Sequence, residues 1–311
     1  MTQPSFDHDT SGSRRVDDST EALAESPVLL AQERREFHAS LLASGTLTVD
    51  RNGVPSNADK QNSRSVMWAQ AIANKLKVET VNERAAGQTS GNTFEDAVAA
   101  YLNSSFPALS ALRPGDWDIR KITGRNASGV SQFEQYRHLA DLDRAVKADP
   151  MLRASLGNAY VVAPDVIIAR NPVSDAVLNA GTLLVDESVA THASLRCSVQ
   201  PDPILHSVVS CKWTLRSDRA QNARTEALNL IRNRKGQVPH IVVVTGEPTL
   251  SRISSLALGT GDIDTVYHFA LYELETAVRD SGDDEHIALL DSMVDGRRLK
   301  DISDLPLDLA I

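Results

Sequence analysis

Cysteine is nearly absent from this sequence, which has only two such residues, Cys197 and Cys211, among its 311. Two cysteines so placed form neither a metal-type spacing nor the disulfide framework of a small secreted protein. No stretch approaches the roughly 20 consecutive apolar residues that a membrane helix needs. The N-terminal run MTQPSFDHDTSGSRR also lacks the apolar core of a signal peptide. We therefore expect a protein with no membrane partner, located in the reducing cytoplasm.

Basic residues are fewer than acidic ones, 32 against 41, which gives a formal net charge of −9. This excess of negative charge alone argues against a nucleic-acid partner. The distribution of charge changes that interpretation. Residues 259–311 hold thirteen acidic and four basic side chains, a difference equal to the excess of the whole chain. Residues 201–252 hold eight basic against four acidic side chains. A locally basic segment on an acidic body can still present a phosphate-binding face, so net charge does not exclude DNA.

The chain divides into a polar tail and one long folded part. Residues 1–26 are rich in Ser, Asp and Thr and predict a flexible tail. Residues 27–311 are expected to form one catalytic and DNA-recognition domain. Apolar spacing predicts helices over residues 28–43, 65–78, 94–106, 131–148, 218–236 and 250–258, with acidic helices after residue 270. Asn92 or Thr93 would cap the third of these, after a loop over 85–92.

Strands are predicted where β-branched and apolar residues gather, over residues 117–123, 159–169, 205–215, 240–245 and 264–269. A polar insert over 171–203 contains a further short candidate at 182–185. From residue 159 onward strands alternate with helices. This order predicts an α/β fold, with a central mixed β-sheet flanked by helices and a helical N-terminal part.

Three charged residues in or near apolar segments suggest a catalytic site. Asp165 lies within VVAPDVII, Lys212 follows VVSC, and Glu226 lies on the next predicted helix. A buried carboxylate is costly without a partner, and Mg²⁺ is an effective one because it prefers one or two carboxylates and keeps several waters. Two acids and a lysine that meet at a sheet edge can cleave a phosphodiester. The metal activates water there, and the lysine offsets the developing charge.

Each of these residues also has an ordinary interpretation. Asp165 could cap a turn or pair with an arginine. Lys212 could extend to solvent from a strand end. Glu226 could lie on the surface of an amphipathic helix, since ARTEALNLIRNR fits one. Only the joint occurrence of the three residues indicates a catalytic site.

A run of charged residues follows the lysine, at the predicted junction of strand and helix. Arginine can donate two hydrogen bonds to the major-groove edge of guanine, and a carboxylate can accept one from cytosine. Arg216, Asp218 and Arg219 could therefore recognise two adjacent G·C pairs, and a second subunit would recognise the other half of a CCGG site. The alternative is a surface cluster of ion pairs near a helix N-terminus.

At these residues the chain resembles the type II restriction endonucleases of the CCGG-cutting family, in the NgoMIV-like branch of the PD-(D/E)XK nuclease superfamily. The resemblance is carried by Pro164-Asp165, Ser210-Cys211-Lys212, Glu226 and the run Arg216-x-Asp218-Arg219. It extends from about residue 27 into the acidic C-terminus and implies a restriction-endonuclease-like core.

The resemblance also implies roles for individual residues. Asp165 and Glu226 would bind Mg²⁺ with the Cys211 carbonyl, and Lys212 would be the catalytic lysine. Ser210 would occupy the position of an acid that has moved to the helix, and Glu95 would support the metal site. Glu95 could equally be an ordinary first-turn glutamate.

The expected DNA site also follows from the resemblance. Gln88 would approach the minor groove, and Asp59 and Arg252 would recognise an outer C·G pair, which gives GCCGGC. Family members leave four-base 5′ overhangs, and this branch forms a tetramer of two dimers. Such enzymes work beside a cognate DNA methyltransferase.

Alternatives remain open at the level of sequence. One is a related nuclease with other outer bases, such as RCCGGY, and another is an inactive DNA-binding relative. A third is a small-molecule α/β enzyme that uses the run 259–262, although this run lacks the pattern of a phosphate loop.

Overall fold

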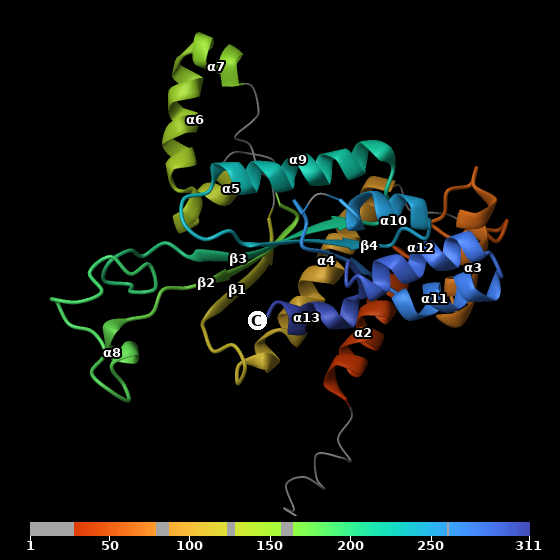
Figure 1. Ribbon diagram of the computed structural model, residues 1–311, viewed down its shortest axis with the longest axis horizontal. Coiled ribbons are helices and arrows are strands. Elements are labelled where there is room, and N and C mark those ends of the chain that lie inside the picture. Colours follow the sequence, from red (N-terminus) through yellow and green to blue (C-terminus); the bar gives the residue numbers. More distant parts are fainter. Residues whose placement is uncertain (1–27, 79–86, 123–127, 157–163, 260) are drawn as a thin grey trace, which may run out of the picture.

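A six-stranded mixed sheet forms the centre of the molecule, with strands in the order β1-β2-β3-β4-β5-β6. The structure is a computed structural model and describes residues 28–78, 87–122, 128–156, 164–259 and 261–311. The predicted tail over residues 1–26 lies outside this part. The sheet confirms the predicted fold class, and Figure 1 shows helices on both of its sides.

The strands divide the sheet into an antiparallel and a parallel half. The first three strands pair antiparallel and the remainder pair parallel. Strand β4 lies in the interior, and its nearly unbroken apolar sequence is typical of a strand covered on both faces. The bounds are β1 Trp117–Lys121, β2 Val166–Arg170, β3 Ile204–Lys212, β4 His240–Thr245, β5 Thr265–His268 and β6 Leu299–Asp301.

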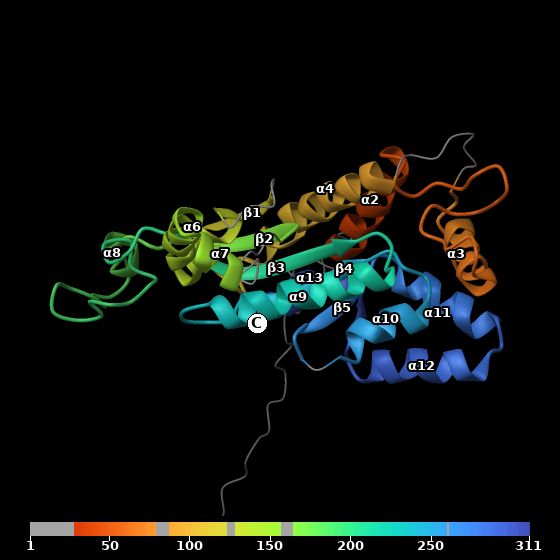
Figure 2. The ribbon, with the colours of Figure 1, turned by 90° about the horizontal axis from the view of Figure 1, so that it is seen from above.

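Helices cover the two faces of this sheet. Helix α4 contacts β1, β2 and β3 on one side, while α9 crosses the other side in both views (Figures 1 and 2). The longer helices are α2 Leu29–Ala43, α3 Ser63–Lys75, α4 Gly87–Ser105, α6 His138–Ala148, α9 Ser217–Asn233, α10 Leu250–Ala257, α11 Leu271–Asp280 and α12 Asp284–Asp295. Shorter ones are α5 Ser128–Ser131, α7 Pro150–Leu156, α8 Asp175–Leu178 and α13 Leu305–Asp308. Within the described ranges, no helix combines the length and apolar character needed to cross a bilayer.

Four local predictions were wrong. Helix α4 begins at Gly87, so residues 87–92 are helical and neither Asn92 nor Thr93 is its cap. The predicted helix over 131–148 is broken before α6, because residues 134–136 form a 3-10 turn. Residues 182–185 are not a strand. Asp165 directly precedes β2 rather than lying within a strand, and residues 159–163 of that predicted strand fall outside the described ranges.

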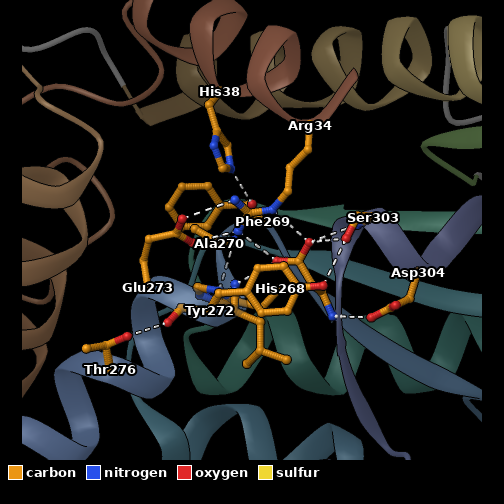
Figure 3. Close-up of polar contacts among 12 residues, drawn as sticks. Arg34, His38, His268, Phe269, Ala270, Tyr272, Glu273, Thr276, Ser303 and Asp304 are labelled. Atoms are coloured by element: carbon orange, nitrogen blue, oxygen red, sulfur yellow. Dashed lines mark hydrogen bonds and ion pairs between the residues drawn. The ribbon is translucent and has the colours of Figure 1, made fainter. Parts of the chain in front are cut away.

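A buried polar cluster ties the N-terminal helix to the parallel half of the sheet. Arg34 and His38 extend from α2 toward Glu273 and Phe269 (Figure 3). The Arg34 guanidinium donates to both Glu273 and Asp301, with distances of 2.6–3.0 Å. His38 Nε2 lies 2.7 Å from the Phe269 carbonyl oxygen. The helical N-terminal part is thereby fixed to the sheet near the ends of β5 and β6.

Candidate active site

The predicted catalytic aspartate and lysine meet at one edge of the sheet. Because β2 runs antiparallel to β3, the residue just before β2 lies beside the C-terminal end of β3. Lys212 Nζ is 2.7 Å from Asp165 Oδ2, and both side chains are largely buried. The ordinary interpretation of Lys212, a side chain extended into solvent, is therefore wrong.

The backbone of Cys211 also belongs to this site. Its N–H donates to Asp165 Oδ2 over 2.7 Å. The N–H and C=O of one strand residue point to the same side of the strand, so the Cys211 carbonyl faces the same space as Asp165. Burial raises the pKa of the Cys211 thiol well above its usual range, and the charge of Asp165 adds to this effect. The thiol is therefore neutral, and the carbonyl is the group that this residue offers to a cation.

Two further acids influence the site from flanking helices. Burial acts to lower the pKa of Lys212, but the charges of Asp165 and Glu226 outweigh it and raise that pKa. Glu226 of α9 is thus close enough to act on the lysine electrostatically. On α4, burial raises the pKa of Glu95, and so does the charge of Asp165. The four predicted charged residues therefore share one region of the fold.

The donor atoms present fit a hydrated Mg²⁺ ion. Asp165 Oδ1 accepts no hydrogen bond from any described residue, and the Ser210 hydroxyl is buried without a hydrogen-bond partner there. Within the described ranges, no group of three or more His, Cys, Asp or Glu side chains is placed to hold a metal. Mg²⁺ does not require one, because one or two carboxylates, a carbonyl oxygen and several waters satisfy it.

Lys121 also lies beside the predicted site, next to Glu95, and nothing in the sequence predicted it there. It lies at the end of β1, and its ammonium is 3.1 Å from Glu95 and 3.0 Å from Asp96. Burial acts to lower the pKa of Lys121, yet these two acids raise it. A lysine at the end of an edge strand carries no distinctive sequence pattern, so only the antiparallel pairing of β1 with β2 reveals its position.

A cavity of about 950 Å³ gathers most of the predicted base-recognition residues. It is lined by side chains from the loop before α3, from the segment after β3 and from α10. Among these are Asp59, Arg216, Arg219 and Arg252.

Asp218 is exposed in the first turn of α9 and is not part of the lining. Gln88 lies in the first turn of α4, and its side chain is outside the described part of the structure.

The residues predicted to recognise the outer base pair contact each other. Arg252 Nη2 donates to the Asp59 carboxylate. This hydrogen bond lowers the pKa of Asp59, with a smaller contribution from the charge of Arg216. Asp59 and Arg252 are far apart in the sequence, yet the fold makes them neighbours at the rim of the cavity.

Comparison with known proteins identifies the family. Residues 37–311 match the family model of the NgoMIV restriction enzyme. The type II restriction enzyme NgoMIV of Neisseria gonorrhoeae is 53% identical over 283 residues, which cover 91% of this chain and 99% of that protein. The chain belongs to the NgoMIV restriction enzyme family.

Membership of the NgoMIV family confirms the resemblance and the predicted enzyme class, a type II restriction endonuclease. It also sets aside the small-molecule enzyme, whose run over 259–262 includes a residue outside the described part. Among solved structures, the crystal structure of the type IIF restriction endonuclease Bse634I with cognate DNA matches with a TM-score of 0.35 and 14% identity, over 78% of this chain and 92% of that one.

Proposed function

We propose that this chain is a Mg²⁺-dependent endonuclease that hydrolyses duplex DNA at GCCGGC and leaves four-base 5′ overhangs. The observation that carries the proposal is the contact of Asp165 with Lys212 and the Cys211 N–H. This contact lies at the end of the strand that leads directly into Arg216, on the wall of the cavity. The proposed cleavage and recognition groups are thus a few residues apart on one segment.

In this proposal, Asp165, Glu226 and the Cys211 carbonyl hold the metal, with Ser210 beside them. A bound Mg²⁺ ion would polarise the scissile phosphate and lower the pKa of a coordinated water. Lys212 places a positive charge within hydrogen-bond distance of Asp165, so it can orient a water and offset charge that develops on the phosphate. Glu95 and Lys121 support this arrangement from α4 and β1.

The proposed base-recognition roles follow from the resemblance, and four of the six residues line the cavity. Arg216 and Arg219 can donate to guanine in the CCGG core, with Asp218 as acceptor for cytosine. Asp59 and Arg252 would separate to meet the outer cytosine and guanine, and Gln88 would approach the minor groove. The two halves of a palindromic site are identical, and two subunits related by a two-fold axis would make identical contacts to them, so we propose a homodimer or a tetramer of two dimers. A cognate methyltransferase would protect the same sites in the cytoplasm.

Digestion of a DNA with mapped CCGG sites, followed by sequencing of the ends, tests this function. We expect Mg²⁺-dependent cleavage that is much faster at GCCGGC than at ACCGGT, with four-base 5′ ends. Equal cleavage of both sites would favour the RCCGGY alternative. Metal-dependent protection of the DNA without strand scission would identify an inactive DNA-binding relative and contradict the proposal.

A further inference from the structure

The turn over residues 246–249, between β4 and α10, connects parts of the site that are distant in the sequence. Thr245 Oγ1 donates to the Lys212 carbonyl over 2.7 Å, and the Gly246 N–H donates to the same oxygen over 3.2 Å. On its other side, Asn57 Nδ2 donates to the Gly246 carbonyl over 2.7 Å. This turn therefore contacts both the strand end with the catalytic lysine and the loop that carries Asp59.

Close packing fixes the position of this turn. A Cβ atom on Gly246 would lie 2.4 Å from the Trp213 ring and 2.9 Å from its carbonyl oxygen. Only glycine allows so close an approach. The turn therefore packs directly against Trp213, the residue after Lys212.

Glu247, in this turn, is a fully buried carboxylate, with 0% of its side chain exposed. Its Oε2 accepts a hydrogen bond from the Leu215 N–H over 2.8 Å, and its Oε1 accepts one from the Thr249 N–H over 3.1 Å. Arg252 Nη1 lies 3.5 Å from Oε2. A buried charge needs such partners, and here they come from both recognition segments.

We infer that Glu247 is a positioning residue that holds Arg252 in place for the outer base pair. The inference rests on the proposed function and adds to it the group that fixes the direction of the arginine. Arg252 has two acidic neighbours, Asp59 and Glu247. Asp59 is 29% exposed and faces the cavity, so it can leave the arginine to accept from cytosine. Glu247 is buried in the interior, so it would stay in contact with Arg252 when Asp59 leaves.

The same carboxylate holds the backbone beside Arg216. Its hydrogen bond to the Leu215 N–H fixes the segment from which the inner guanine contact would start. The Glu247 carboxylate therefore contacts both the backbone beside Arg216 and the side chain of Arg252, the proposed inner and outer base-recognition arginines. Errors in its position would affect the choice of outer base most, because the Arg252 side chain itself depends on it.

The variant Glu247→Gln tests this role, because it keeps the shape of the side chain and removes the charge. The measurement is the ratio of cleavage rates at GCCGGC and at ACCGGT, which share the CCGG core. We expect this ratio to fall about 10-fold, as for the loss of one well-placed base contact. In an Arg252→Ala background, Glu247→Gln should lower the ratio no further, because the two act as one unit.

Asp301→Asn is the matched control. Asp301 is also fully buried, accepts a backbone hydrogen bond from the Leu271 N–H and pairs with an arginine, Arg34. It is not among the residues that line the cavity. We expect this variant to be less stable but to keep the wild-type ratio.

Three results would overturn the inference. They are an unchanged ratio in Glu247→Gln, an equal fall in Asp301→Asn, and a further fall in the Arg252→Ala background. If Glu247→Gln does not fold, Glu247→Asp keeps the charge but withdraws it by one methylene, and a wild-type ratio in that variant overturns the inference too. Failure of the proposed function would appear in the wild-type enzyme itself, as no preference for GCCGGC.

Discussion

Two arginines of this protein are each held by two carboxylates, but in different surroundings. Arg34 donates through Nε, Nη1 and Nη2 to Asp301 and Glu273, and the ring of Tyr272 lies 4.7 Å from its guanidinium carbon. Arg252 contacts Asp59 and Glu247, yet no described residue accepts a hydrogen bond from its Nε. The side chain of Arg34 is 14% exposed and that of Arg252 is 31% exposed.

The two clusters differ in how far they are closed to solvent. The Arg34 cluster uses every nitrogen of its arginine within the protein and joins α2 to the ends of β5 and β6. The Arg252 cluster leaves donors available and opens into the cavity. An arginine with two carboxylates therefore stabilises the fold where it is closed to solvent. Where it borders the cavity, the same combination leaves donors that can bind a ligand.

Removal of Arg34 should have the largest effect on stability. Arg34→Ala leaves the carboxylates of Asp301 and Glu273 buried without their cation, which costs about 3–5 kcal/mol of unfolding free energy. Chemical denaturation measures this loss. The neighbouring Arg35, which is exposed on the same helix, is the control, and Arg35→Ala should change stability by less than about 0.5 kcal/mol. Equal effects of the two variants would refute the structural role of the sealed cluster.

Removal of Arg252 should instead affect specificity. Arg252→Ala is expected to lose about 1–3 kcal/mol of discrimination at the outer base pair. Its loss of stability should be smaller than that of Arg34→Ala, because the Glu247 carboxylate keeps its hydrogen bonds from the Leu215 and Thr249 N–H groups. Cleavage rates at GCCGGC and ACCGGT measure it. Lys60 lines the same cavity, so Lys60→Ala removes a positive charge there without removing a proposed base contact. A similar loss of discrimination in Lys60→Ala would contradict the assignment of Arg252.

The smallest expected effect is a difference in the sign of pH dependence between the clusters. Burial acts to raise the pKa of Glu273, but Arg34 outweighs it and holds that pKa below its ordinary value. Burial also raises the pKa of Glu247, and there the N–H donors and Arg252 do not outweigh it. Glu273 therefore contributes stability above its unfolded-state pKa, which is lost as pH falls through its folded-state value. Glu247 contributes stability below its unfolded-state pKa, which is lost as pH rises through its folded-state value.

Urea unfolding across the acidic range measures this difference. Relative to wild type, the destabilisation by Glu273→Gln should shrink as the pH falls. The destabilisation by Glu247→Gln should shrink as the pH rises. Slopes of the same sign in the two variants would show that the clusters do not differ in the way described.

The sequence predicted those parts of the molecule that local patterns determine. The apolar run of β4 predicted a buried strand with the observed bounds, His240–Thr245. The run from Ser210 to Arg219 predicted the lysine that contacts Asp165 and two of the arginines that line the cavity. In each case the information lies within one element and its neighbours.

Features that depend on distant contacts could not be predicted from the residues alone. Asp59 and Arg252 were placed only by resemblance, because their contact joins the loop before α3 to α10. Glu247 was missed because a glutamate in a turn is usually solvated, and only the fold shows it to be buried. The break in the helix over 131–148 is similar, since Gln135 leaves helical geometry to bond the backbone of Leu205.

The most direct test of the central claim is the variant Asp165→Asn, incubated with Mg²⁺ and a DNA that carries one GCCGGC site. We expect cleavage to fall by a factor of at least about 1,000, while specific binding of the site in a gel-shift assay is retained. An Asp165→Asn enzyme that cuts this site at the wild-type rate would contradict it.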